Sequence, residues 1–138
     1  MRTLASLVLA TLLLAPAARA ADAIPRYELD TKDSTSALRR GGEGKLVLVI
    51  RAKDGWHVDP RTPLKIELSA SEGLKLAKAR LGKADAVDPK AESPRFEAPF
   101  TAVAAGAHEA KAKVDFFVCS ADACVKQVKD VTFHVAVK

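Results

Sequence analysis

The chain has two cysteines, Cys119 and Cys124, and they are the residues whose chemistry is easiest to anticipate. Residues 120–123 separate them, and the segments on both sides alternate as strands do, so the pattern predicts a hairpin with a four-residue loop. Residues facing each other across a hairpin have Cα atoms about 4.5–5.5 Å apart, a spacing that a disulfide tolerates. An even cysteine count in an exported chain makes a disulfide the default expectation.

Two roles for this bond stay open at this stage. The closed loop spans only about six residues, for which the chain-entropy model gives about 2 kcal/mol, near the low end of disulfide contributions. A bond that staples a fold gains more by joining distant segments, which favours a redox role for Cys119 and Cys124. The alternative is a local structural pin that fixes one hairpin.

Other site chemistries find less support in the sequence. A metal site would combine the cysteines with His57, His108 or His134, but the spacing matches no zinc signature and an oxidising compartment works against free thiolates. No Ser-His-Asp spacing, carboxylate pair or Gly-rich phosphate loop is found. We therefore expect no metal and no cofactor, and Cys119 and Cys124 are the only candidate catalytic residues.

The N-terminus predicts export. A short basic start at Arg2 is followed by an apolar run and then by the small-x-small sequence of residues 18–20, which is typical of a cleaved signal peptide at 1–20. Cleavage leaves 118 residues, enough for one domain, with a net charge of +3 (20 Lys and Arg against 17 Asp and Glu). We expect a periplasmic or extracellular protein with no membrane span in the mature chain. The scattered lysines and few aromatic residues favour no nucleic-acid partner.

The hydrophobic pattern predicts that strands position the cysteines. Apolar residues alternate at 64–68, 74–76, 112–118 and 131–137, and the segment 45–51 holds a continuous apolar run between Lys45 and Arg51, typical of a central strand buried on both faces. Residues 21–44 are expected to hold a tail, a first strand at 27–30 and a loop at 33–44, and residues 45–138 the rest of the domain, with a long loop at 82–95 marked by glycine and proline. Six or seven short strands indicate an all-β, immunoglobulin-like antiparallel β-sandwich, with a small barrel as the alternative.

Two segments together resemble a known family. The stretch from Phe116 to Cys124, and the Gly-Trp-His segment that begins at Gly55 about sixty residues earlier, are similar to the N-terminal periplasmic domain of the thiol:disulfide interchange protein DsbD. The order and rough distances of these motifs match over about residues 45–137.

This resemblance implies an immunoglobulin-like fold and a redox function. In such a domain Cys119 and Cys124 would receive electrons from a membrane-embedded partner and pass them to thioredoxin-like proteins or to cytochrome c maturation. Phe116 would stand for the aromatic residue that precedes the first cysteine. The chain departs from the pattern after Cys124, where it lacks two prolines, and at 84–91, the expected cap loop, which has no aromatic residue.

The sequence thus leads to two hypotheses. The first is a periplasmic thiol:disulfide exchange domain that acts through an exposed Cys-x4-Cys pair. The second is a non-catalytic secreted binding domain whose hairpin disulfide is structural. The sequence leaves open which role the bond has, and hence whether the chain belongs to an enzyme.

Overall fold

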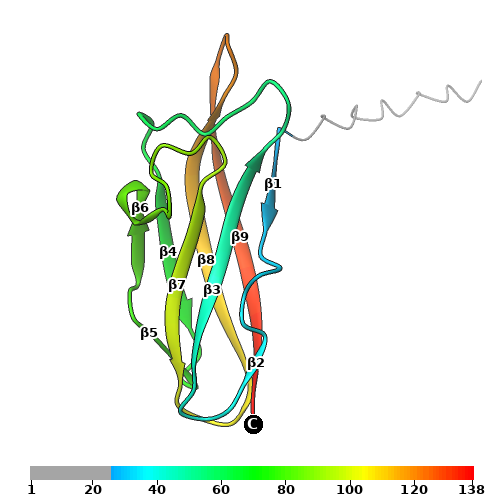
Figure 1. The fold of residues 1–138 in the computed structure, drawn as a ribbon, viewed down its shortest axis with the longest axis vertical. Coiled ribbons are helices and arrows are strands. Elements are labelled where there is room, and N and C mark those ends of the chain that lie inside the picture. The colour runs from blue at the N-terminus through cyan, green and yellow to red at the C-terminus, as the bar shows by residue number, and fades with distance from the viewer. Residues whose placement is uncertain (1–25) are drawn as a thin grey trace, which may run out of the picture.

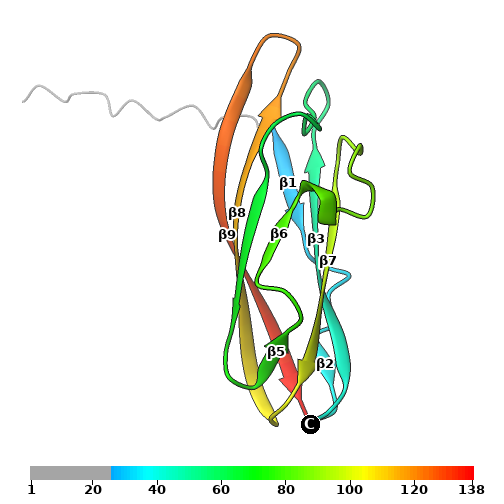
Figure 2. The same ribbon diagram turned by 90° about the vertical axis from the view of Figure 1, so that its left-hand side faces the viewer.

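The computed structural model describes residues 26–138, and the predicted signal peptide lies outside them. The described chain is a β-sandwich of two layers (Figures 1 and 2). Its strands are β1 (Tyr27–Asp30), β2 (Ala37–Leu38), β3 (Glu43–Ala52), β4 (Lys65–Ala70), β5 (Leu74–Leu76), β6 (Arg80–Gly82), β7 (Arg95–Ala102), β8 (Gly106–Cys119) and β9 (Cys124–Val137). No helix among the described residues is long and apolar enough to cross a membrane.

The strands form one sheet in the order β1-β3-β7-β5 and a second in the order β2-β9-β8-β4-β6. Neighbouring strands are antiparallel, as the sequence predicts, except that β2 pairs with β9 in parallel. The expected loop of residues 33–44 is therefore wrong in part, because Ala37–Leu38 joins the edge of the second sheet and β3 already begins at Glu43. The expected loop at 82–95 likewise begins with the end of β6 and one short 3-10 turn, Lys83–Asp85.

The core lies between the two sheets and is built from the alternating positions that the sequence indicated. On β8 the buried inward side chains are those of Ala110, Ala112, Val114, Phe116 and Val118. They meet the inward side chains of β3 and β7, among which Phe96 and Phe100 are almost fully buried. Burial of large apolar side chains at about 1.5–3 kcal/mol each supplies the main favourable term for this fold.

Strand β3 is buried on both faces, as its continuous apolar run predicts. Residues 46–50 are all buried, although only alternate side chains can point into the core. The outward Val47 and Val49 lie opposite Glu97 and Arg95 of β7 in the register. Arg95 forms ion pairs with Asp33 and Glu97 there, so charged side chains of neighbouring segments flank the outward valines.

The long β8–β9 hairpin sets the position of the cysteines. Its register runs from Gly106 opposite Val137 to Cys119 opposite Cys124. The turn at residues 120–123 projects at one end of the sandwich, and the C-terminus lies at the other end (Figure 1). The hairpin turn extends beyond the neighbouring loops in both views (Figures 1 and 2).

Candidate functional site at the β8–β9 turn

A disulfide joins Cys119 and Cys124, the last facing pair of the hairpin. Their Cα atoms are 4.0 Å apart, somewhat closer than the sequence-based expectation. The loop is closed by a hydrogen bond from the Ser120 amide to the Ala123 carbonyl, with an N···O distance of 2.8 Å. The predicted hairpin and the predicted bond are both confirmed.

The two cysteines differ in their exposure to solvent. Cys119 is 2% exposed, whereas Cys124 is classed as exposed. The prediction of an exposed bond is therefore right for one of its ends and wrong for the other. A partner that approaches from solvent meets Cys124 first.

The disulfide lies on the outer face of its sheet, away from the core. Successive residues of a strand point to opposite faces, and Phe116 and Val118 point inward. Phe116 is fully buried and packs edge-on against Tyr27, with ring centroids 5.0 Å apart. The aromatic residue that shares the face of Cys119 is therefore Phe117, which is partly buried, whereas Phe116, which the resemblance matches to the aromatic residue before the first cysteine, points into the core.

The Gly-Trp-His segment lies directly beside the disulfide. His57 forms an antiparallel bridge with Cys119, in which the His57 amide donates to the Cys119 carbonyl at 2.9 Å and the Cys119 amide donates to the His57 carbonyl at 2.8 Å. Gly55, with a φ of 81°, permits the turn that leads into this segment. Trp56 is partly buried and packs against the core, and the Arg26 guanidinium lies 5.1 Å from its ring centroid.

A charged cluster follows His57 along the same segment. The buried Asp59 carboxylate accepts two hydrogen bonds from the Arg61 guanidinium, at 3.1 and 2.8 Å, and one from the Arg61 amide at 2.8 Å. These bonds hold the pKa of Asp59 far below its ordinary value. The Nε2 atom of His57 lies 3.9 Å from Asp59 Oδ2.

Lys83 and the residue Glu92 also hold this segment. The Lys83 ammonium donates to the backbone carbonyls of Asp59 and Thr62, and burial lowers its pKa. The fully buried Val58 donates its amide to the carbonyl of Glu92 at 2.9 Å. The segment that approaches the disulfide is therefore held by contacts with Lys83 and Glu92, although the sequence analysis gave no site role to Asp59 or Lys83.

The expected cap loop at 84–91 has no aromatic side chain to place over the disulfide. Its apolar residue Val87 is 65% exposed, while its neighbour Ala86 is buried and bridges to Phe96 of β7. The amide of Val87 donates to the carbonyl of Arg95. These backbone contacts tie the loop to the start of β7.

The remaining histidines lie away from the disulfide. His108 and His134 belong to the opposite end of the β8–β9 hairpin, where His134 Nδ1 is 3.4 Å from Glu109 and His108 Nε2 is 2.8 Å from the Ala104 carbonyl oxygen. Within residues 26–138 the structure brings together no group of three or more metal-ligating side chains.

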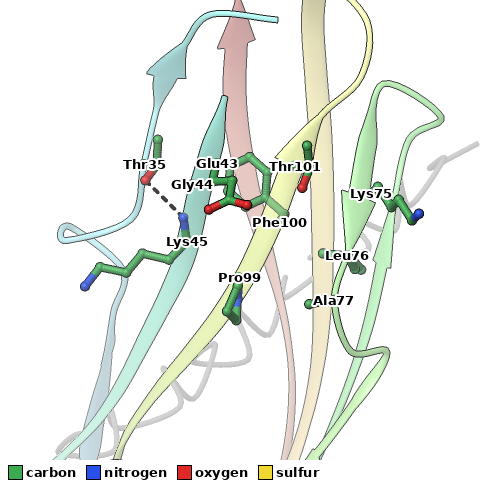
Figure 3. A pocket seen from close by; sticks show the side chains of 10 residues that line it. All are labelled: Thr35, Glu43, Gly44, Lys45, Lys75, Leu76, Ala77, Pro99, Phe100 and Thr101. Atoms are coloured by element: carbon green, nitrogen blue, oxygen red, sulfur yellow. Dashed lines mark hydrogen bonds between the residues drawn. The ribbon is translucent and has the colours of Figure 1, made fainter. Parts of the chain in front are cut away.

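An open pocket lies across β3, β5 and β7, away from the cysteines (Figure 3). Its charged lining residues Glu43, Lys45 and Lys75 are all exposed. Because none of them is withdrawn from water, the lining offers no group whose environment marks a reactive or ligand-binding site.

Comparison with known proteins adds structural similarities only. No protein-family model and no curated protein matches the chain. Among solved structures, a conjugative transposon lipoprotein from Bacteroides eggerthii is 13% identical with a TM-score of 0.46, over 80% of this chain and 96% of that one. Alpha-2-macroglobulin of E. coli is 18% identical with a TM-score of 0.45, over 81% of this chain and 6% of that one. AggA, the major subunit of aggregative adherence fimbriae type I from Escherichia coli, is 10% identical with a TM-score of 0.40, over 81% and 94%. Similarity at this level assigns no activity to the chain.

Proposed function

We propose that the chain is an exported thiol:disulfide exchange domain of the periplasm, with Cys119 and Cys124 as its redox pair. The observation that carries this proposal is the unequal exposure of the two cysteines at a projecting hairpin turn. Cys124 is open to solvent, while Cys119 is buried between Cys124 and the strand-like segment at His57. Exchange requires a thiolate to reach one sulfur of the bond, and here one end of the bond is reachable.

The exchange follows from this arrangement. A thiolate of a partner dithiol attacks Sγ of Cys124, the bond to Cys119 Sγ breaks, and Cys119 leaves as a thiolate. The partner's second thiolate then attacks the partner sulfur that is bonded to Cys124 in the mixed disulfide. This step forms the partner's disulfide and releases Cys124 as a thiolate. The chain thereby gains two electrons, and the reverse sequence passes them to a partner disulfide.

The partners proposed are thioredoxin-like or membrane-embedded thiol:disulfide proteins, the classes that the resemblance to DsbD implies. The hairpin turn suits such an encounter because residues 121–123 are Ala, Asp and Ala, which are small and exposed. A partner sulfur therefore meets no large side chain from this loop as it approaches Cys124.

The test is to reduce the native protein with a dithiol while thiol release and near-ultraviolet circular dichroism are followed together. We expect thiols to appear rapidly while the tertiary signal is unchanged. We also expect a reduction potential above about −300 mV, the level below which structural disulfides typically lie. A double variant in which both cysteines become Ser should fold and lose exchange activity.

A second candidate function is a non-catalytic secreted binding domain with a structural disulfide. The burial of Cys119 at 2% exposure favours it, because a buried sulfur is protected from exchange at that end. This candidate predicts that thiols appear only as the tertiary signal is lost. It also predicts a potential below about −300 mV, so the same two measurements decide between the candidates.

A further inference from the structure

The bridge between His57 and Cys119 places His57, Cys119 and Cys124 side by side on three neighbouring extended segments. His57 lies directly opposite Cys119, and Cys119 lies directly opposite Cys124. Directly opposite residues of antiparallel segments send their side chains to the same face, with Cβ atoms about 4.5–5.5 Å apart. The imidazole of His57 and the two sulfurs therefore share the outer face, with Cys119 in the middle.

We propose that His57 stabilises the thiolate of Cys119 when the disulfide opens. This inference rests on the proposed function and adds to it the group that receives the buried leaving sulfur. Attack on the exposed Cys124 leaves the negative charge on Cys119, the end of the bond with least access to water. Burial alone disfavours a thiolate, so its release needs a donor or a positive charge from the protein.

An imidazole meets this need in either of its protonation states. Protonated, it forms an ion pair with the thiolate, and neutral, it still carries one N–H that donates a hydrogen bond. Among the described residues, the carboxylate that lies within 4 Å of the ring is that of Asp59, 3.9 Å from Nε2. The Asp59 carboxylate is itself held by two hydrogen bonds from the Arg61 guanidinium, so its charge is already paired with that of Arg61.

Two further features support a chemical role over a purely structural one. The backbone of His57, not its side chain, makes the bridge to Cys119, so the segment stays in register whatever side chain position 57 carries. The side chain is also about one-third exposed, so the core does not require it for packing.

The experiment titrates Cys119 alone, in the variant Cys124→Ser, by the absorbance of the thiolate at 240 nm as a function of pH. We expect the further change His57→Leu to raise the pKa of the Cys119 thiol by about one pH unit, since it removes both charge and donor. His57→Gln, which keeps a neutral donor, should raise it less. His134→Leu is the matched control, because that ring also lies beside a carboxylate but at the far end of the hairpin.

An equal thiol pKa in the His57→Leu and His134→Leu chains would overturn the inference, provided that near-ultraviolet circular dichroism shows both to be folded. In the two-cysteine protein, we expect His57→Leu to slow reduction by dithiothreitol about tenfold at pH 7 relative to His134→Leu, and equal rates would also count against it. The single-cysteine titration needs no exchange partner. A shifted pKa together with a bond that resists reduction would therefore refute the proposed function while retaining the pairing of His57 with Cys119.

Discussion

Reduction of the disulfide should weaken the protein less than the truncation of one core side chain does. The bond closes a loop of about six residues between cysteines that are five positions apart in the sequence, for which the chain-entropy model gives about 2 kcal/mol. The bonded pair lies at the end of a hairpin whose register continues down to Gly106 opposite Val137. The hydrogen bonds of that ladder and the core beneath it do not depend on the sulfurs.

The magnitude can be compared with that of a core truncation. Phe96 is 1% exposed and lies between the sheets, so Phe96→Ala should cost about 3–5 kcal/mol. With a urea m value of about 2 kcal/mol per molar for a domain of this size, reduction should lower the unfolding midpoint by about 1 M and Phe96→Ala by about 2 M.

The assay is urea unfolding of the oxidised chain, the reduced chain and the oxidised Phe96→Ala variant, each followed by near-ultraviolet circular dichroism. We expect the reduced chain to keep its tertiary signal in the absence of urea. A reduced chain that is unfolded without urea, or that loses more stability than Phe96→Ala, would refute this reasoning. It would also favour the second candidate function, in which the disulfide is structural.

Three further predictions concern the N-terminus, the Asp59–Arg61 ion pair and the packing around Gly44. N-terminal sequencing of the exported protein should show that it begins after residue 20, and a retained Met1 in the membrane fraction would contradict cleavage. Because Arg61 holds the pKa of Asp59 low, the unfolded chain binds the proton first, so the urea midpoint should fall as the pH drops below about 4. Arg61→Met should make the urea midpoint fall less steeply with decreasing pH. An unchanged pH dependence would show that the Asp59–Arg61 pair does not contribute to stability. Gly44→Ala should lower the free energy of unfolding by about 1–3 kcal/mol, because a Cβ would lie 2.6 Å from a ring carbon of the buried Phe100; an unchanged urea midpoint would argue against this contact.

Much of the sandwich follows from side-chain alternation alone. Apart from Cys119, the buried positions of β8 and β9 are those that the period of two assigns to one face, and the unbroken apolar run within β3 correctly indicates burial on both sides. Local pattern and final burial agree here because each strand is long enough for the alternation to be counted.

The same reasoning misses β2, for a physical reason. Two residues carry no period, and Ala37–Leu38 becomes a strand only because its neighbours bond to the end of β9. The Ala136 amide donates to the Ser36 carbonyl, and the Lys138 amide donates to the Leu38 carbonyl. A pairing between segments about 100 residues apart leaves no mark on the local sequence.

In the candidate site too, features within one hairpin are predictable from the sequence, and tertiary contacts are not. The Cys119–Cys124 bond is predictable because both residues belong to one hairpin, and the opposite orientation of Phe116 and Phe117 also follows from counting along that hairpin. The position of His57 beside Cys119 is not predictable in this way, because it is a tertiary contact between segments more than sixty residues apart. The charged cluster at Asp59 is also in part a tertiary contact, because Lys83 belongs to the short 3-10 turn that follows β6.

The arrangement of the site links its stability to its chemistry. A disulfide that closes a short turn contributes little to folding, so the fold does not need the bond to remain closed. The contacts that hold the His57 segment against Cys119 come from Asp59, Lys83 and the backbone, and none of them involves a sulfur atom. Opening the bond therefore leaves the surroundings of the buried Cys119 in place, while Cys124 stays on the exposed side. A pair arranged in this way can change its redox state within a fixed framework, which is what an exchange domain requires and what a structural pin does not.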